Sequence, residues 1–422
     1  MNINLLKGAV KKALGYGIGN VLNTAAMILL LPTFVHLSGT NGYFSAQGML
    51  IAQVASIFGS YTFSLTIPRA LEILNIELKK ALLCELIIFQ IAIGILGISV
   101  IFLLNRDCTL SGICSYLIVY SSVVQWQWLH IANKASHIQA ILLLTSRMAI
   151  IILEVYAMNL VNPSQQVEWL FSTLITAAFC LTIFPTILLF DIKEITKNTI
   201  KKRFGILIMN ELKKGRQLFL ASLLTSIYSL GPSILVSLLN PPLLILIQQF
   251  DRIRLAVSNA SGMLLGAVYP LLIGVSKGHL MSGFKILQKY VLIPIVTCNL
   301  VLFFSMPLIP VETVAILSKL QMTIASFGLA LIAGLCATSS NAITLTFLHP
   351  IESDRFYLIT ISMGALLFLL AASLSYMFIP LGSIGIFLML SVVLVEFMVN
   401  IILWSRGRSL LAEYARSITN NT

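Results

Sequence analysis

Charged residues are scarce in this sequence. Asp, Glu, Lys and Arg make up 10% of its 422 residues, whereas hydrophobic residues make up 58%, and the mean hydropathy is +0.97. A water-soluble domain cannot bury so large an apolar fraction, so the composition predicts an all-α integral membrane protein with many spans. No polar stretch is long enough for a separate soluble domain, because the longest connector has about 26 residues.

The sequence also lacks the motifs of an enzyme or a metalloprotein. Its five His residues have no metal-ligand spacing, its six Cys residues fit no metal or redox motif, and it contains no Gly-Lys-Ser/Thr phosphate loop. We therefore expect no catalytic residue, no metal site, no cofactor and no ATP hydrolysis. We also expect no cleavable signal peptide, because Lys7, Lys11 and Lys12 lead directly into a full-length apolar run.

Apolar runs long enough to cross a bilayer recur twelve times. The predicted spans are about 13–35, 42–68, 81–104, 111–130, 138–160, 167–190, 217–239, 243–275, 290–309, 321–347, 356–379 and 382–404. A basic connector, Asp191–Arg216, separates two sets of six, which predicts one bundle in residues 1–204 and a second in 205–422. Pro32 and Pro68 in the first half are spaced like Pro232 and Pro270 in the second, which indicates a weak internal repeat of the kind found in transporters.

Basic residues collect on one side of this predicted topology. Of the 27 Lys and Arg residues, 22 lie at the termini or in connectors on the amino-terminal side, and two, Arg106 and Lys319, lie on the other side. The remaining three lie within spans. Such an asymmetry is produced by the positive-inside rule, so it predicts that both termini are cytoplasmic. It also explains the net charge of +12 without nucleic-acid binding.

The run 243–275 contains three charged residues, Asp251, Arg252 and Arg254, which are costly inside a membrane. On a helical wheel, one polar stripe about 120° wide contains Gln248, Asp251, Arg252, Ser258, Asn259, Gly262 and Gly266. Arg254 lies three residues after Asp251 and can pair with it, which leaves Arg252 without a partner on its own helix. Two interpretations remain open: Arg252 attracts an anion in a hydrated cavity, or the charged turns stand in the headgroup region because the run is longer than one span needs.

Other predicted spans carry polar residues that could line the same cavity. Asn23 lies on a stripe with two glycines in the first span, and Gln53 lies on a stripe with three serines in the second. Such stripes indicate either close helix packing or a hydrated lumen. Arg147 and Glu154 share one face of the fifth span and could instead snorkel to its ends. Glu396 lies near the middle of the last span, one turn from Asn400, as a neutral packing residue or as a proton or cation site.

Short motifs along the whole chain resemble those of a known transporter family. They are Leu30-Leu31-Pro32, Gly42-Tyr43-Phe44-Ser45-Ala46, Arg69, Trp126-Gln127-Trp128, Gly215-Arg216-Gln217-Leu218-Phe219-Leu220-Ala221-Ser222 with Tyr228, Asp251-Arg252-Ile253 and Tyr269-Pro270. With these motifs the chain resembles the polysaccharide-transporter branch of the multidrug/oligosaccharidyl-lipid/polysaccharide (MOP) exporter superfamily, the Wzx-type O-antigen flippases.

The resemblance implies two six-helix bundles arranged as a V with pseudo-two-fold symmetry, as in MATE transporters. It implies a flippase in the bacterial inner membrane that translocates undecaprenyl-pyrophosphate-linked oligosaccharide units by alternating access, with possible H⁺ or Na⁺ coupling and possible contacts to the polymerase and chain-length machinery. The candidate substrate-binding residues are Arg252, Arg147, Arg254, Gln248, Asn259, Asn23 and Gln53, and the ion-coupling candidates are Glu396, Glu154 and Asp251. A drug/cation antiporter of the same superfamily is the alternative. An O-antigen polymerase or acyltransferase is disfavoured, because no long outer loop is present.

The predicted topology places Cys108, which follows the third span, outside the cytoplasm. We expect a membrane-impermeant thiol reagent to label it in spheroplasts whose inner membrane is intact. Labelling that requires disruption of that membrane would contradict the twelve-span topology.

Overall fold

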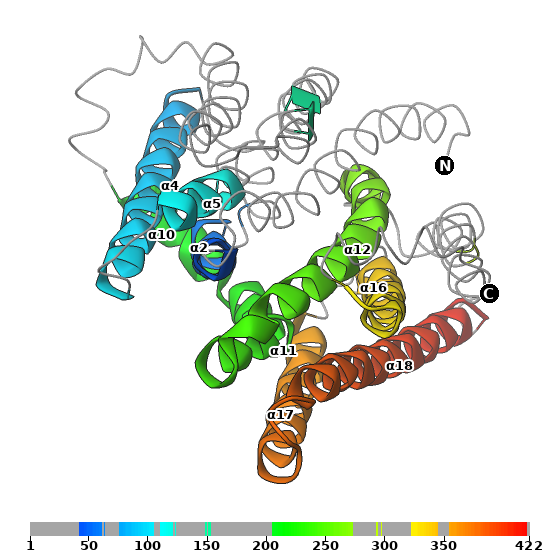
Figure 1. The fold of residues 1–422 in the computed structure, drawn as a ribbon. Coiled ribbons are helices and arrows are strands. Elements are labelled where there is room, and N and C mark those ends of the chain that lie inside the picture. Colours follow the sequence, from blue (N-terminus) through cyan, green and yellow to red (C-terminus); the bar gives the residue numbers. More distant parts are fainter. Residues whose placement is uncertain are drawn as a thin grey trace. The chain divides into compact units, whose positions relative to one another are not determined.

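A computed structural model describes residues 42–60, 76–104, 110–120, 205–272, 322–344 and 354–419, together with a few single positions between them. Within these ranges every element is a helix (Figure 1). The elements are α2 (Gly42–Ser60), α4 (Ile76–Leu104), α5 (Leu110–Tyr120), α10 (Ile206–Lys214), α11 (Arg216–Leu239), η5 (Pro241–Leu243), α12 (Leu244–Leu272), α16 (Ile324–Ile343), α17 (Asp354–Phe378) and α18 (Ile384–Thr419).

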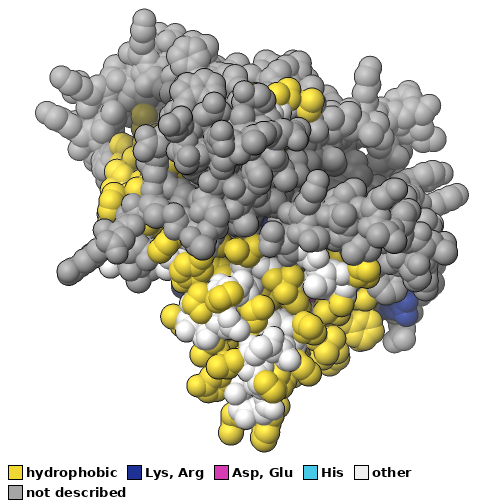
Figure 2. Space-filling model, viewed as in Figure 1, with side chains coloured by type: hydrophobic (Ala, Val, Ile, Leu, Met, Phe, Trp, Pro, Cys, Tyr) yellow, Lys and Arg dark blue, Asp and Glu magenta, His cyan; other side chains and the backbone are white. Residues whose placement is uncertain are grey.

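Five of these helices, α4, α11, α16, α17 and α18, contain stretches that are long and apolar enough to cross a membrane. Their outer faces keep large apolar side chains exposed, including Leu366, which is 62% exposed, and Phe378, which is 75% exposed. Hydrophobic side chains cover much of the described surface in the view of Figure 2. Because lipid rather than water can accommodate such a surface, the protein is a multi-pass integral membrane protein.

Eight helices, α2, α4, α5, α11, α12, α16, α17 and α18, fall on predicted spans. Two features were not predicted. The helix α18 continues to Thr419, beyond the expected end of the last span at residue 404, and the basic connector contains the helix α10. The spans expected at 13–35, 138–160, 167–190 and 290–309 lie wholly or largely outside the described residues, so the count of twelve stays a prediction.

The chain divides into two compact units at Leu224, within α11. We call the described residues before Leu224 the N-terminal unit and those from Leu224 onward the C-terminal unit. The division into residues 1–204 and 205–422 was expected from the basic connector and stays a prediction about the complete bundles.

The N-terminal unit is built around α2, which packs against α4 and α5. Two tyrosines of α5, Tyr116 and Tyr120, stack with their ring centroids 5.5 Å apart and lie over Gly94 and Gly97 of α4. The Tyr116 hydroxyl donates to the Gly94 carbonyl at 2.9 Å, and the Tyr120 hydroxyl donates to the Gln90 carbonyl at 2.6 Å. The glycines therefore make room for the rings, and each buried hydroxyl finds an acceptor, as a membrane interior requires.

In the C-terminal unit, α12 packs against α16 and α18, and α18 also packs against α16 and α17. The approach of α16 to α12 depends on Gly334, since a Cβ atom there would lie 2.6 Å from the Val257 Cβ and 2.9 Å from the Arg254 carbonyl oxygen. Next to this contact, Asn341 Nδ2 donates to Ser258 Oγ at 3.0 Å. Small residues and interhelical hydrogen bonds thus hold these two helices together, in the way typical of membrane bundles.

We expect Gly334→Ala to destabilise the protein. The added methyl group overlaps the backbone of α12, and overpacking costs about 1–3 kcal/mol, which exceeds the gain of about 1 kcal/mol in helix propensity. The measurement is the thermal unfolding midpoint of the purified protein in detergent. Gly385→Ala is the matched control on α18, because its Cβ would meet only the side-chain methyl groups of Leu243 at 3.4 Å and Ile247 at 3.8 Å. An unchanged midpoint for Gly334→Ala would contradict the close packing of α12 and α16.

Candidate functional site

The candidate site lies on α12, in the turn that contains Asp251, Arg252 and Arg254. The helix begins after the proline turn of η5 and runs for 29 residues, which is longer than the roughly 20 residues that one crossing needs. All three charged side chains are buried. An ionic group removed from water must be compensated inside the protein, so the partners of these three residues decide what the site can do.

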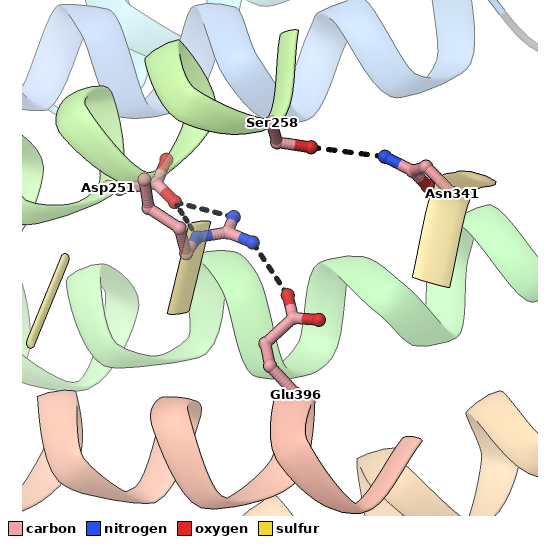
Figure 3. Close-up of polar contacts among 5 residues, drawn as sticks. Asp251, Ser258, Asn341 and Glu396 are labelled. Carbon is pink, nitrogen blue, oxygen red and sulfur yellow. Dashed lines mark hydrogen bonds and ion pairs between the residues drawn. The ribbon is translucent and has the colours of Figure 1, made fainter. Parts of the chain in front are cut away.

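Arg254 is shared between two carboxylates (Figure 3). Its Nη2 and Nε atoms lie 2.7 Å and 3.1 Å from Asp251 Oδ1, and its Nη1 atom lies 2.8 Å from Glu396 Oε1. The pair with Asp251 was predicted from the three-residue spacing on α12, and the distances confirm it. The partner on α18, Glu396, was not predicted, because Glu396 and Arg254 are 142 residues apart in the sequence.

These contacts give Arg254 a structural role. Each of its three nitrogens makes a charge-assisted hydrogen bond, a stronger class than a bond between neutral groups. The guanidinium joins α12 to α18, and the carboxylate of Glu396 is thereby held in an ion pair. The expected alternatives for Glu396 were a neutral packing residue or a proton or cation site, and the structure adds a third role as the anion that fixes Arg254.

Arg252 is in a different situation. It is only 7% exposed, and its Nε and Nη2 atoms are fully buried with no hydrogen-bond partner among the described residues. The Oδ1 atom of its neighbour Asp251 accepts hydrogen bonds from Arg254. A guanidinium offers five N–H donors in a planar fork. Arg252 is therefore a buried guanidinium with two nitrogens unpaired among the described residues, and its role in attracting an anion stays a prediction.

The structure describes some of the other candidate residues. Gln248 lies one turn before Arg252 on α12 and is fully buried, and Gln53 of α2 is buried within the N-terminal unit. Asn259 is in α12, but its side chain is outside the described residues, as are Asn23, Arg147 and Glu154. The structure thus brings together Gln248, Asp251, Arg252, Arg254 and Glu396 in one unit; their role in binding stays a prediction.

Two polar contacts near the site were missed in the sequence. Asn341 of α16 donates to Ser258 of the predicted stripe, and Thr338 Oγ1 donates to the Val257 carbonyl at 3.3 Å. The four consecutive polar residues at positions 338–341 in an otherwise apolar helix were the signal that could have found them. Among the described residues, no group of three or more His, Cys, Asp or Glu side chains could hold a metal ion.

The fold of the chain is similar to that of several solved structures. No protein-family model matches the sequence, and no curated protein matches it significantly. The fold is similar to the outward-facing conformation of a multidrug resistance MATE family transporter of the MOP superfamily, with a TM-score of 0.61, 15% identity, and coverage of 97% of this chain and 96% of the other. The inward-facing conformation of such a transporter also gives a TM-score of 0.61, at 13% identity over 94% and 96% of the two chains.

A third similar structure is MATE in complex with MaL6, with a TM-score of 0.60 and 15% identity over 97% of both chains. The similarity extends over almost the whole chain in each case. The chain therefore has the fold seen in these MATE transporters.

The ion pairs of Arg254 predict that removing the arginine lowers the stability of the protein more than removing one of its two carboxylates. We expect Arg254→Met to lower the unfolding midpoint strongly, because it removes the cation shared by two buried carboxylates, a loss of about 3–5 kcal/mol. Glu396→Gln should cost much less, since Asp251 still pairs with Arg254 and a glutamine oxygen can still accept its hydrogen bond. Both are measured as thermal unfolding of purified protein and as protein level in membranes.

The triple variant Asp251→Asn/Arg254→Met/Glu396→Gln removes all three charges and should recover part of the stability lost in Arg254→Met. Arg408→Met, at an exposed position near the carboxyl end of α18, is the control and should be neutral. A Glu396→Gln variant as unstable as Arg254→Met would contradict the shared-cation arrangement.

Proposed function

We propose that this protein is a flippase that moves undecaprenyl-pyrophosphate-linked oligosaccharide units, of O-antigen or a related surface polysaccharide, from the inner to the outer leaflet of a bacterial inner membrane. The observation that carries the proposal is Arg252, a buried guanidinium with two nitrogens unpartnered among the described residues. The MATE-type fold supports transport by alternating access, since solved transporters with this fold include outward-facing and inward-facing conformations.

The chemistry of such a substrate matches a buried arginine. A pyrophosphate bears several negatively charged oxygens, and the guanidinium fork can bind two of them at once. Low-dielectric walls focus the field of the cation and increase its attraction for anions. The polyprenyl tail is apolar and can stay in the bilayer while the sugar headgroup crosses. In this proposal Arg252 binds the pyrophosphate, and Gln248, Asn259, Asn23, Gln53 and Arg147 contact the headgroup.

The contacts of Arg254 change the role that we propose for it. It was expected to share in anion binding, but its three nitrogens already bind Asp251 and Glu396. We therefore assign Arg254 to the positioning of α12 against α18. If transport is coupled to H⁺ or Na⁺, Glu396 and Asp251 would act by releasing Arg254, and Glu154 remains a separate candidate.

The orientation of the protein follows from its charge distribution. With 22 basic residues on one side of the predicted topology and two on the other, both termini are proposed to be cytoplasmic. In this orientation the pyrophosphate is taken up on the side where the lipid-linked unit is assembled, and it is released on the opposite side, where contact with polymerase and chain-length machinery would follow.

A drug/cation antiporter is the second candidate function. The observation in its favour is that two of the similar solved structures are of a multidrug resistance transporter. A cationic substrate needs an available carboxylate, and the two buried carboxylates of the described site, Asp251 and Glu396, are both engaged by Arg254. Among the charged side chains described in this unit, Arg252 has nitrogens without a hydrogen-bond partner, which favours an anionic substrate.

The decisive variant is Arg252→Ala. We expect it to reduce surface polysaccharide roughly tenfold or more, because it removes charge-assisted hydrogen bonds to the pyrophosphate, without lowering the amount of protein in the membrane. Arg252→Lys should recover part of the activity, since it keeps the charge and loses the fork. The measurement is complementation of a flippase-null strain, scored by lipopolysaccharide gel beside an immunoblot.

Arg408→Ala is the matched control, because it removes an exposed arginine near the end of α18, and it should complement fully. Normal polysaccharide in Arg252→Ala cells would show that Arg252 does not bind the substrate. Efflux of a lipophilic cation by the wild-type protein, with no complementation of the flippase-null strain, would instead support the antiporter.

A further inference from the structure

The helix α10 has a face that the described structure leaves uncovered. It comprises only nine residues, Ile206–Lys214, and follows Gly205, whose φ of 86° is in the left-handed region that favours glycine. Gly215 separates it from α11, and the apolar stretch of α11 begins at the next residue, Arg216. The helix α10 therefore lies directly before a segment that is long and apolar enough to cross a membrane.

The inner face of α10 is fixed to α4. Ile208 is buried, and its backbone N–H donates to Glu85 Oε2 at 2.9 Å. Glu85 itself lies about one turn inside the apolar stretch of α4, which begins at Ala81. Its carboxylate satisfies one of the amide groups that a helix leaves unpaired in its first turn, and it interacts favourably with the helix dipole. This contact fixes which side of α10 points outward.

The outward side combines apolar and basic groups. Ile206 is 54% exposed and Met209 is 53% exposed, and on the helical wheel Lys213 lies between them. Asn210 and Lys214 complete this surface, which we call the outer face of α10. Its one acidic neighbour, Glu211, is buried and paired with Lys214 at 2.6 Å. The outer face is therefore apolar and positively charged, with no exposed carboxylate on α10.

We propose that the outer face of α10 binds anionic phospholipid headgroups. Ile206 and Met209 would lie at the boundary between headgroups and acyl chains, and Lys213 and Lys214 would contact the lipid phosphates. Exposed apolar side chains interleaved with lysines are typical of helices that lie in the membrane interface. The remaining basic residues of the connector, including Arg216, add to the attraction of an anionic leaflet. This inference does not depend on the transported substrate.

Hydrogen exchange of the full-length protein in lipid nanodiscs tests the proposal. Discs of phosphatidylcholine are compared with discs that contain equal parts of phosphatidylcholine and phosphatidylglycerol. Each basic residue near an anionic leaflet contributes about a fivefold preference, so two lysines should slow the exchange of the α10 amides roughly tenfold or more in the anionic discs. Equal exchange rates in the two kinds of disc would overturn the proposal.

Lys213→Gln is the informative variant, because it leaves the pair between Glu211 and Lys214 intact. It should reduce the dependence on phosphatidylglycerol about fivefold, whereas Lys213→Arg should keep it. Arg408→Gln, at an exposed position of α18, should leave the exchange of α10 unchanged. A Lys213→Gln variant with the full lipid dependence would overturn the assignment.

If α10 of the Lys213→Gln variant exchanges faster in both lipids than wild-type α10 does in phosphatidylcholine, the substitution has unfolded the helix, and the salt dependence of the wild-type protein is then the test. Salt at about 1 M reduces the Debye length to about 3 Å, so it should abolish the difference between the two lipids if the contact is electrostatic. A difference that persists in salt would overturn the role of the lysines.

Discussion

The C-terminal unit depends on how it accommodates charge in an apolar environment. A guanidinium inside a membrane protein is stable only with compensating anions, and Arg254 has two, one on its own helix and one on α18. This requirement places α12 and α18 together and orients Asp251 toward Arg254. Arg252 then keeps two nitrogens without a hydrogen-bond partner among the described residues. The candidate binding group is thus a consequence of how its neighbours are paired.

The sequence predicted those features that arise from local spacing or from composition. Apolar runs located eight of the helices, because burial in lipid requires about 20 consecutive apolar residues, and the three-residue spacing of Asp251 and Arg254 predicted their pair. The contact with Glu396 was not predictable, since nothing local relates residues so far apart. The helix α10 was missed because it is short and lies within a basic connector, and its four apolar residues followed by polar residues around Leu212 were the available signal.

Polar residues in the predicted spans illustrate why polarity alone does not locate a cavity. The stripe on α2 was expected to indicate either close packing or a hydrated lumen. In the structure the hydroxyl groups of Ser56 and Ser60 donate to carbonyl groups of their own helix, one turn earlier, and Ser375 and Ser391 do the same on α17 and α18. A serine hydroxyl can therefore donate its hydrogen bond within its own helix and needs no water in lipid. A buried arginine cannot, which is why Arg252 is the more informative residue.

The ion pair between α12 and α18 also has a consequence for how the chain is made. The helix α12 carries three charged residues, Asp251, Arg252 and Arg254, which are costly inside a membrane. The carboxylate that completes its charge balance is on the last helix, 142 residues later, and a ribosome needs roughly 7 to 30 s to synthesise that length. During this interval α12 carries Arg254 with only Asp251 as a counter-ion. The ion pair that joins α12 to α18 can therefore form only after α18 has been synthesised, late in the making of the C-terminal unit.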